Sequence, residues 1–178
     1  MIRFPRLRRL ALYTFGGLAG VVLLLGFATC STEDPQAGAC PTPEPGSAAA
    51  GALANVRSAA GFDVLYPCQL PGAERIETAT ISGPAGRHRV ELFFDGPFEM
   101  AIRQSQFPPP FTPAPTGASR VTIDLFPNVR AILLEVNDGT SKAEYHLFWE
   151  QSGLFYEIQA LGPPLQRRTI LLIARSLQ

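Results

Sequence analysis

The sequence predicts an α+β domain: an antiparallel sheet of about seven strands, running as a meander, packs against an N-terminal and a C-terminal helix. Between residues 62 and 161, segments with apolar residues at alternate positions are separated by short turn sequences rich in Gly, Pro and Asn, as in half-buried strands. Helical patterns flank these segments at 47–60 and 165–177. Such a sheet is expected to have one face on the helices and one face toward water.

An N-terminal membrane segment is expected to precede the domain, because residues 10–29 are apolar and contain no charge. About 20 such residues can cross the hydrocarbon core of a bilayer. An arginine-rich run, residues 3–9, comes before them, and positive charge stays on the cytoplasmic side. We therefore predict a signal or transmembrane segment at 1–30, and a chain that lies outside the cytoplasm after it.

Three fates of this segment are open: a retained single-pass anchor, a lipoprotein signal cut before Cys30, and a secretory signal that leaves nothing behind. Phe27-Ala28-Thr29-Cys30 resembles a lipobox but has Thr29 where Gly, Ala or Ser is usual. Cys30 is thus a possible lipidation site. The expected location is the cell membrane, single-pass or lipid-anchored, with the C-terminal domain extracytoplasmic.

The chain has three cysteines, Cys30, Cys40 and Cys68, so one is left over after any pairing. Thiols tend to oxidise outside the cytoplasm. If Cys30 is lipidated or lies at the membrane edge, Cys40 and Cys68 are available for a disulfide, which we hypothesise. We expect no metal site, because there is no C-x-x-C spacing and the two histidines are isolated.

Residues 31–47 are rich in Pro, Thr, Glu, Gly and Ser and lack large apolar residues, which is typical of a linker. The extracytoplasmic domain, residues 48–178, then begins with an alanine-rich helix. Ser47 is its expected N-cap, and Leu53, Val56 and Ala60 fall on one face.

The apolar alternation predicts where the strands, turns and final helix lie. The expected strands are 62–66, 74–82, 88–95, 98–106, 121–125, 128–136, 142–150 and 154–161. Residues 108–117 are a proline-dense stretch that we interpret as a long hairpin connection, and 137–140 and 151–153 are tight turns. In the final helix, Leu165, Thr169, Leu172 and Ile173 share a face, and Pro163 and Pro164 suit its first turn.

Phe93, Phe148 and Phe155 have the opposite parity from their core-facing neighbours. Either a helix covers the second face of the sheet, which we expect, or that face is an apolar binding surface. We expect the two histidines, His88 and His146, to be solvated. The acidic residues at alternating strand positions should be exposed as well; they are Glu91, Glu99, Asp124, Glu135, Glu144, Glu150 and Glu157.

Charge and motifs exclude several functions. Fifteen Lys and Arg balance fifteen Asp and Glu, which argues against nucleic-acid binding. The sequence contains no nucleophile elbow, P-loop or dinucleotide fingerprint. We therefore predict that the protein is not an enzyme, and we expect no catalytic residue and no cofactor.

Several structural motifs occur along the predicted domain: residues 62–67 followed by Leu70-Pro71-Gly72, and the stretches 90–94, 103–105, 149–156 and 173–177. Together they resemble a bacterial extracytoplasmic domain of unknown function that is found at the C terminus of anti-sigma-factor-like membrane proteins. The resemblance covers about residues 60–178. It implies no catalytic residue. Only nine residues precede Leu10, whereas those proteins carry a cytoplasmic domain there, so we do not expect sigma-factor binding.

Two functions follow. The first is a membrane-tethered interaction or sensory module that binds a peptide, a protein or an envelope polymer outside the membrane. The alternative rests on a looser similarity to periplasmic lipoprotein carriers, which hold acyl chains between a curved antiparallel sheet and helices. A carrier of a lipid or other apolar ligand predicts an apolar surface lined by Phe94, Leu133, Leu147 and Ile173.

Overall fold

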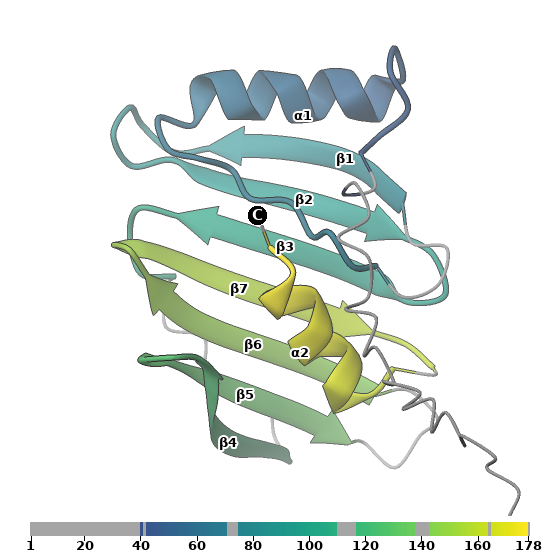
Figure 1. Ribbon diagram of the computed structural model, residues 1–178, viewed down its shortest axis with the longest axis vertical. Coiled ribbons are helices and arrows are strands. Elements are labelled where there is room, and N and C mark those ends of the chain that lie inside the picture. The colour runs from purple at the N-terminus through teal and green to yellow at the C-terminus, as the bar shows by residue number, and fades with distance from the viewer. Residues whose placement is uncertain are drawn as a thin grey trace, which may run out of the picture. The chain divides into compact units, whose positions relative to one another are not determined.

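Seven antiparallel strands form one open sheet in the order β1-β2-β3-β7-β6-β5-β4 (Figure 1). The computed structural model describes residues 40, 42–70, 75–109, 117–137, 143–163 and 165–177. They belong to one unit, 35–178. The strands are β1 Arg75–Ser82, β2 Arg89–Asp95, β3 Glu99–Ser105, β4 Ala118–Phe126, β5 Val129–Asn137, β6 Ala143–Gln151 and β7 Leu154–Leu161. With helices α1 (Ala48–Ala59) and α2 (Arg167–Arg175), they confirm the α+β class.

The prediction of a simple meander is wrong. Strands β1 to β3 form one meander and β4 to β7 form a second, and the two are joined where β3 pairs with β7. The proline-dense stretch is therefore not a hairpin connection, because it leads from the middle of the sheet to its far edge. Alternation along a strand fixes which side chains share a face but not which strands become neighbours.

One face of the sheet is the core face. Leu92, Ile102, Ile158, Leu147 and Leu133 lie side by side across β2, β3, β7, β6 and β5, and each is fully buried. Helix α2 packs on this face and crosses β6 and β7 in Figure 1. Both helices contribute their buried residues to the same hydrophobic core.

Helix α1 confirms the prediction for residues 47–60. Its first turn is capped by Ser47, whose hydroxyl accepts a hydrogen bond from the Ala50 amide at 3.1 Å. Leu53, Val56 and Ala60 are buried, as their spacing indicates. The helix runs along β1, at the edge of the sheet (Figure 1).

Residues 62–66 are not a strand, contrary to the prediction. They form an extended segment on the core face, held by the side chain of Gln104, a fully buried residue. The Gln104 amide nitrogen donates to the Leu65 carbonyl at 2.7 Å, and its carbonyl oxygen accepts from the Leu65 amide at 2.8 Å. One side chain thus satisfies the backbone groups that a neighbouring strand would otherwise satisfy.

Helix α2 starts later than predicted, at Arg167, so Pro163 precedes the helix instead of lying in its first turn. Its buried face consists of Ile170, Ile173 and Ala174. Leu172 was predicted on the buried face but is 44% exposed. The helix begins two residues beyond the expected start, and the contacts of its short buried face leave Leu172 toward solvent.

Three loop features complete the description. The predicted turn at 151–153 is confirmed: Ser152 and Gly153 join β6 and β7 with positive φ angles of 53° and 76°. Strands β5 and β6 pair as the hairpin signal predicts, although residues 138–142 of the turn lie outside the described residues. A disulfide joins Cys40 to Cys68, the pairing that the cysteine arithmetic favours.

Candidate functional site

The side of the sheet opposite α2 is termed the open face. Within the described parts of the chain, neither helix lies on it, so the expectation that a helix covers Phe93, Phe148 and Phe155 is wrong there. All three side chains are half-buried. They are shielded by their neighbours within the sheet, because long side chains on adjacent strands cover one another.

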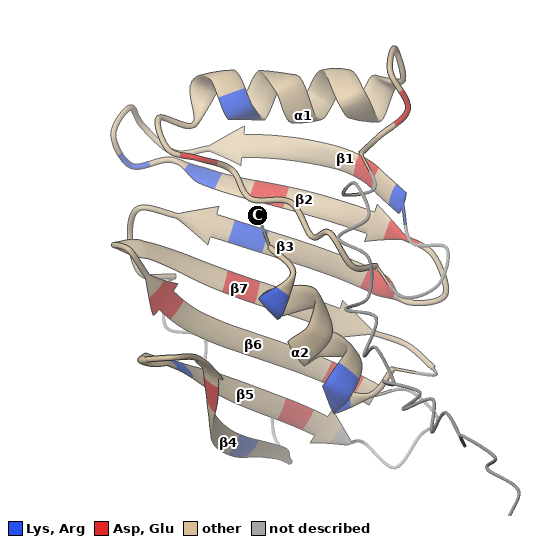
Figure 2. Ribbon diagram, in the orientation of Figure 1, with Lys and Arg blue, Asp and Glu red and all other residues tan. Residues whose placement is uncertain are grey.

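Charged side chains of β2, β3, β7 and β6 meet at the centre of the open face. Figure 2 shows acidic, basic and acidic positions side by side on β2, β3 and β7. Register places Glu91 opposite Arg103, and Arg103 opposite Glu157. The polar cluster is defined as Glu91, Arg103, Glu144, His146, Glu157 and Gln159.

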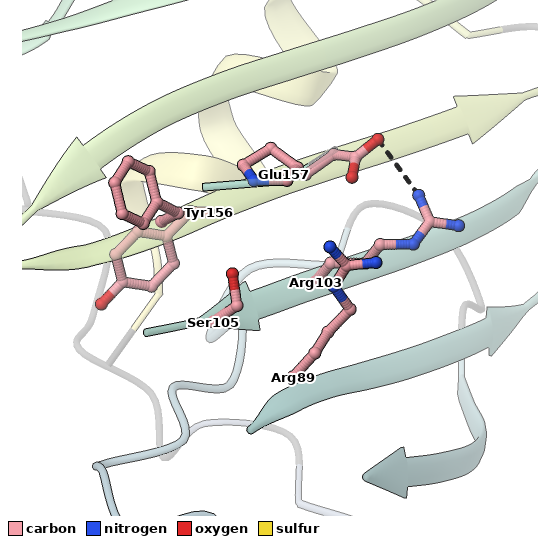
Figure 3. A pocket seen from close by; sticks show the side chains of 7 residues that line it. Arg89, Arg103, Ser105, Tyr156 and Glu157 are labelled. Carbon is pink, nitrogen blue, oxygen red and sulfur yellow. Dashed lines mark ion pairs between the residues drawn. The ribbon is translucent and has the colours of Figure 1, made fainter. Parts of the chain in front are cut away.

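Arg103 is the hub of the polar cluster. Its Nε donates to Glu91 Oε1 at 3.2 Å, and its Nη1 lies 3.1 Å from Glu157 Oε1 (Figure 3). The same Nη1 donates to Gln159 Oε1 at 3.0 Å. A guanidinium presents several donors in a fixed plane, and here one guanidinium connects three strands.

Contacts on β6 close the cluster into a ring. Gln159 Nε2 donates to Glu144 Oε1 at 3.2 Å, and the same carboxylate oxygen lies 2.7 Å from His146 Nε2. The other imidazole nitrogen, Nδ1, lies 3.9 Å from Glu157 Oε1, an ion-pair distance. Arg103, Gln159, Glu144, His146 and Glu157 form this ring, in which each side chain contacts two others, and Glu91 is attached to it through Arg103. Moving one side chain of the ring therefore disturbs the rest.

The ring is shielded from water and holds more acid than base. The His146 and Glu157 side chains are 14% and 15% exposed. Interaction with Glu157, and then with Glu144, raises the pKa of His146 despite burial. Burial alone would raise the pKa of Glu157, but His146 and Arg103 together lower it. The cluster thus contains three acidic side chains, Glu91, Glu144 and Glu157, against one guanidinium and one imidazole whose pKa is raised.

These positions correct several predictions. His146 is not solvated but lies between two carboxylates, and Glu91, Glu144 and Glu157 are half-buried in the same cluster. His88 is also not free in solvent, because its Nδ1 is buried without a partner in the structure. The alternation in the sequence predicted on which face of the sheet these side chains lie. The contacts of His146 with Glu144 and Glu157 lie within the β6–β7 hairpin, whereas the contacts of Glu157 and Gln159 with Arg103 depend on β3 pairing with β7, which the sequence did not indicate.

A small hollow with a volume of about 10 Å³ borders the polar cluster. Arg89, Arg103, Ser105, Phe155 and Glu157 contribute to its lining (Figure 3). Small-molecule pockets are usually about 300–1,000 Å³, so this hollow is too small to enclose such a ligand. Arg89, which lines the hollow, also has its guanidinium carbon 5.3 Å from the centre of the Phe107 ring, and the Arg87 guanidinium carbon lies 5.6 Å from the same ring.

The cluster lacks the parts of a hydrolytic site. Nucleophilic catalysis needs a nucleophile within hydrogen-bond reach of a base, and the described partners of His146 are carboxylates. Ser105, the serine that lines the hollow, donates its hydroxyl to the Phe107 carbonyl at 2.6 Å. Among the described residues no group of His, Cys, Asp and Glu could hold a metal ion. No catalytic residue is assigned.

The other predicted site residues lie elsewhere. Phe94, Leu133, Leu147 and Ile173 are on the core face, are at most 3% exposed, and belong to one continuous hydrophobic core. Cys30 and the expected membrane segment lie outside the described residues. In the part of the chain that is described, no helix is long and apolar enough to cross a membrane.

Comparison of the chain with protein-family models, with curated proteins and with solved structures returned no match. Its function is therefore argued from the open face alone.

Proposed function

We propose that the domain is a non-catalytic interaction module, tethered at the membrane by the N-terminal segment, that binds an extracytoplasmic protein or peptide on its open face. The observation that supports this most is the polar cluster itself. It is a shielded, mutually bonded set of charges on a sheet face that no described helix covers.

The composition of the open face favours a macromolecular partner. Half-buried apolar side chains, Phe93, Ile132 and Phe148, border the polar cluster. Protein interfaces combine central aromatic and arginine residues with a polar surround. The hollow is too small for a drug-sized ligand, whereas an extended protein surface could contact several strands at once.

Rigidity of the polar cluster supports recognition. Because the side chains of Arg103, Glu157 and His146 hold one another, little side-chain entropy remains to be lost on binding. The excess of carboxylates favours a partner that presents cationic side chains beside apolar ones.

Site-specific photocrosslinking in the full chain tests this proposal. A photoreactive phenylalanine analogue at Phe148, on the open face, should capture a partner in intact cells. The matched control carries the same analogue at Ala54, which is exposed on α1. The Arg103→Met change, made in the Phe148 background, should reduce capture. Equal capture from both positions would contradict the proposal.

The carrier alternative remains a separate prediction. Native mass spectrometry of the full chain in detergent should show the protein free of bound lipid if the core face is filled by side chains. A stoichiometric lipid that is lost on Leu147→Arg substitution would favour the carrier instead.

A further inference from the structure

The outer edge of β4 is a second surface where another chain can bind. Strand β4 is the last in the sheet, and within the described residues it pairs only with β5. At the opposite edge, α1 runs along β1 (Figure 1). An uncovered edge strand presents unpaired N–H and C=O groups that can pair with another strand.

The side chains of β4 are arranged symmetrically about Thr122. Arg120 and Asp124 lie two positions to either side, point to the open face and are exposed. In the described structure neither makes an ion pair; Arg130 lies opposite Asp124 in register without such a contact. Val121 and Ile123, the residues before and after Thr122, point to the core face and are half-buried.

We propose that β4 pairs with β4 of a second copy of this chain, antiparallel and centred on Thr122, which extends the sheet across a two-fold axis. In this register Arg120 of each copy lies opposite Asp124 of the other, and Val121 lies opposite Ile123. Opposite charges and apolar pairs placed directly across an antiparallel ladder are stabilising. A two-fold contact uses the same surface on both copies, so both pairs occur twice.

Charges on an edge strand commonly prevent pairing. Whether they prevent or favour pairing between two copies depends on which signs come to lie opposite each other. Two like charges at these positions would repel in the self-paired register, whereas Arg120 and Asp124 attract. Two bonds from Arg175 mark the limit of the contact: its Nε donates to the Leu125 carbonyl at 3.0 Å, and its Nη2 donates to the Asp124 carbonyl at 3.4 Å. Main-chain hydrogen bonds between the copies are therefore expected over residues 121–123, with the Arg120 and Asp124 side chains paired at either end.

Helix α2 adds an apolar group on the core-face side of this edge. Leu172 is 44% exposed and lies one turn before Arg175, so both project from neighbouring parts of the helix surface. Because Arg175 reaches β4, Leu172 also faces that edge. A contact built from one short strand and one leucine per copy is small beside a stable interface of about 1,200–2,000 Å², so the expected dimer is weak and reversible.

Disulfide crosslinking of the full chain in membranes tests this pairing. Thr122→Cys places two thiols across the two-fold axis, where facing Cβ atoms are about 4.5–5.5 Å apart, close enough for a disulfide after small shifts. The matched control is Thr80→Cys, which is exposed on β1 at the other edge. The unmodified chain, with its three native cysteines, sets the baseline. We expect at least about fivefold more crosslinked homodimer from T122C than from T80C.

Charge reversal in the T122C background identifies the register. Either R120D or D124R places like charges opposite each other twice and should lower the crosslinked fraction by about fivefold or more, the factor that corresponds to 1 kcal/mol. The double variant R120D/D124R exchanges the charges and should restore crosslinking.

The proposal is overturned if T122C crosslinks no more than T80C, if its crosslinks join a different protein, or if the double variant fails to restore what a single reversal removes. These changes lie at the β4 end of the open face, outside the polar cluster on β2, β3, β6 and β7. Failure of the pairing therefore leaves the contacts of Arg103 intact and is distinguishable from failure of the Phe148 crosslinking experiment.

Discussion

Replacing Gln104 with methionine tests whether one buried side chain fixes the extended segment over the core. Methionine has a similar size but can neither donate to nor accept from Leu65. Two hydrogen bonds, of 2.7 and 2.8 Å, are lost, each contributing about 0.5–1.5 kcal/mol net, and the orphaned backbone groups add a cost of about 1–3 kcal/mol each when fully buried. Leu65 is half-buried, so water can satisfy part of this loss. We expect a total of about 2–4 kcal/mol.

Urea unfolding followed by the emission of Trp149, the chain's single tryptophan, measures this loss. With a urea dependence of about 2 kcal/mol/M, the midpoint should fall by about 1–2 M at an unchanged slope. Gln159→Met is the matched control, because that amide also makes two hydrogen bonds but lies on the half-buried open face; its midpoint should fall by less than about 0.5 M. Equal shifts for the two variants would refute the role given to Gln104, as would unchanged hydrogen-exchange protection of the Leu65 amide.

Three further predictions follow from the described contacts. Arg103→Met should lower the free energy of unfolding by about 1–3 kcal/mol, because it leaves shielded carboxylates unpaired, whereas Arg167→Met, which breaks an exposed pair, should change the urea midpoint little. His146→Gln should cost most stability below pH 6.5, the ordinary pKa of the imidazole. Because the pKa of His146 is raised in the folded protein, the stabilisation by its protonated form is lost as the pH rises through that pKa. If urea titrations gave the same difference in free energy of unfolding between parent and variant at pH 5.5 and at pH 8.5, the result would contradict this assignment. In the Cys40→Ser/Cys68→Ser double variant the free energy of unfolding should fall by about 3–4 kcal/mol, as expected for a loop closed over a sequence separation of 28. Adding reductant to the parent chain should lower its free energy of unfolding in urea titrations by the same amount.

Much of the local structure was predictable because it depends on neighbours in sequence. The alternation that places Leu92 and Phe94 on one face is a property of any extended chain, and Ser47 caps α1 through a contact only three residues away. The tight turn at Ser152 and Gly153 is likewise local. The start of helix α2 was predicted two residues too early. The packing of a helix on the rest of the protein decides which residues form its first turn.

The predictions that failed depend on which strands are neighbours. Residues 62–66 read as a strand because they are apolar and end at Pro67, but their backbone is satisfied by Gln104, 39 residues away from Leu65. A polar residue at a core-facing strand position was the available signal, since buried amides need partners. Glu157 likewise looked exposed, because its contact with Arg103 forms only once β3 is paired with β7.

The sequence by itself determined the α+β class, the two helices, the positions of the seven strands and the face on which most side chains lie. These follow from periods of 3.6 and 2 residues and from turn chemistry, which act over short distances along the chain. The tertiary structure alone decided the order β1-β2-β3-β7-β6-β5-β4. With that order come the edge position of β4, which no other described strand pairs on its outer side, and the polar cluster around Arg103. Both depend on contacts between residues distant in sequence, and in particular on the pairing of β3 with β7, which the pattern along either strand does not encode.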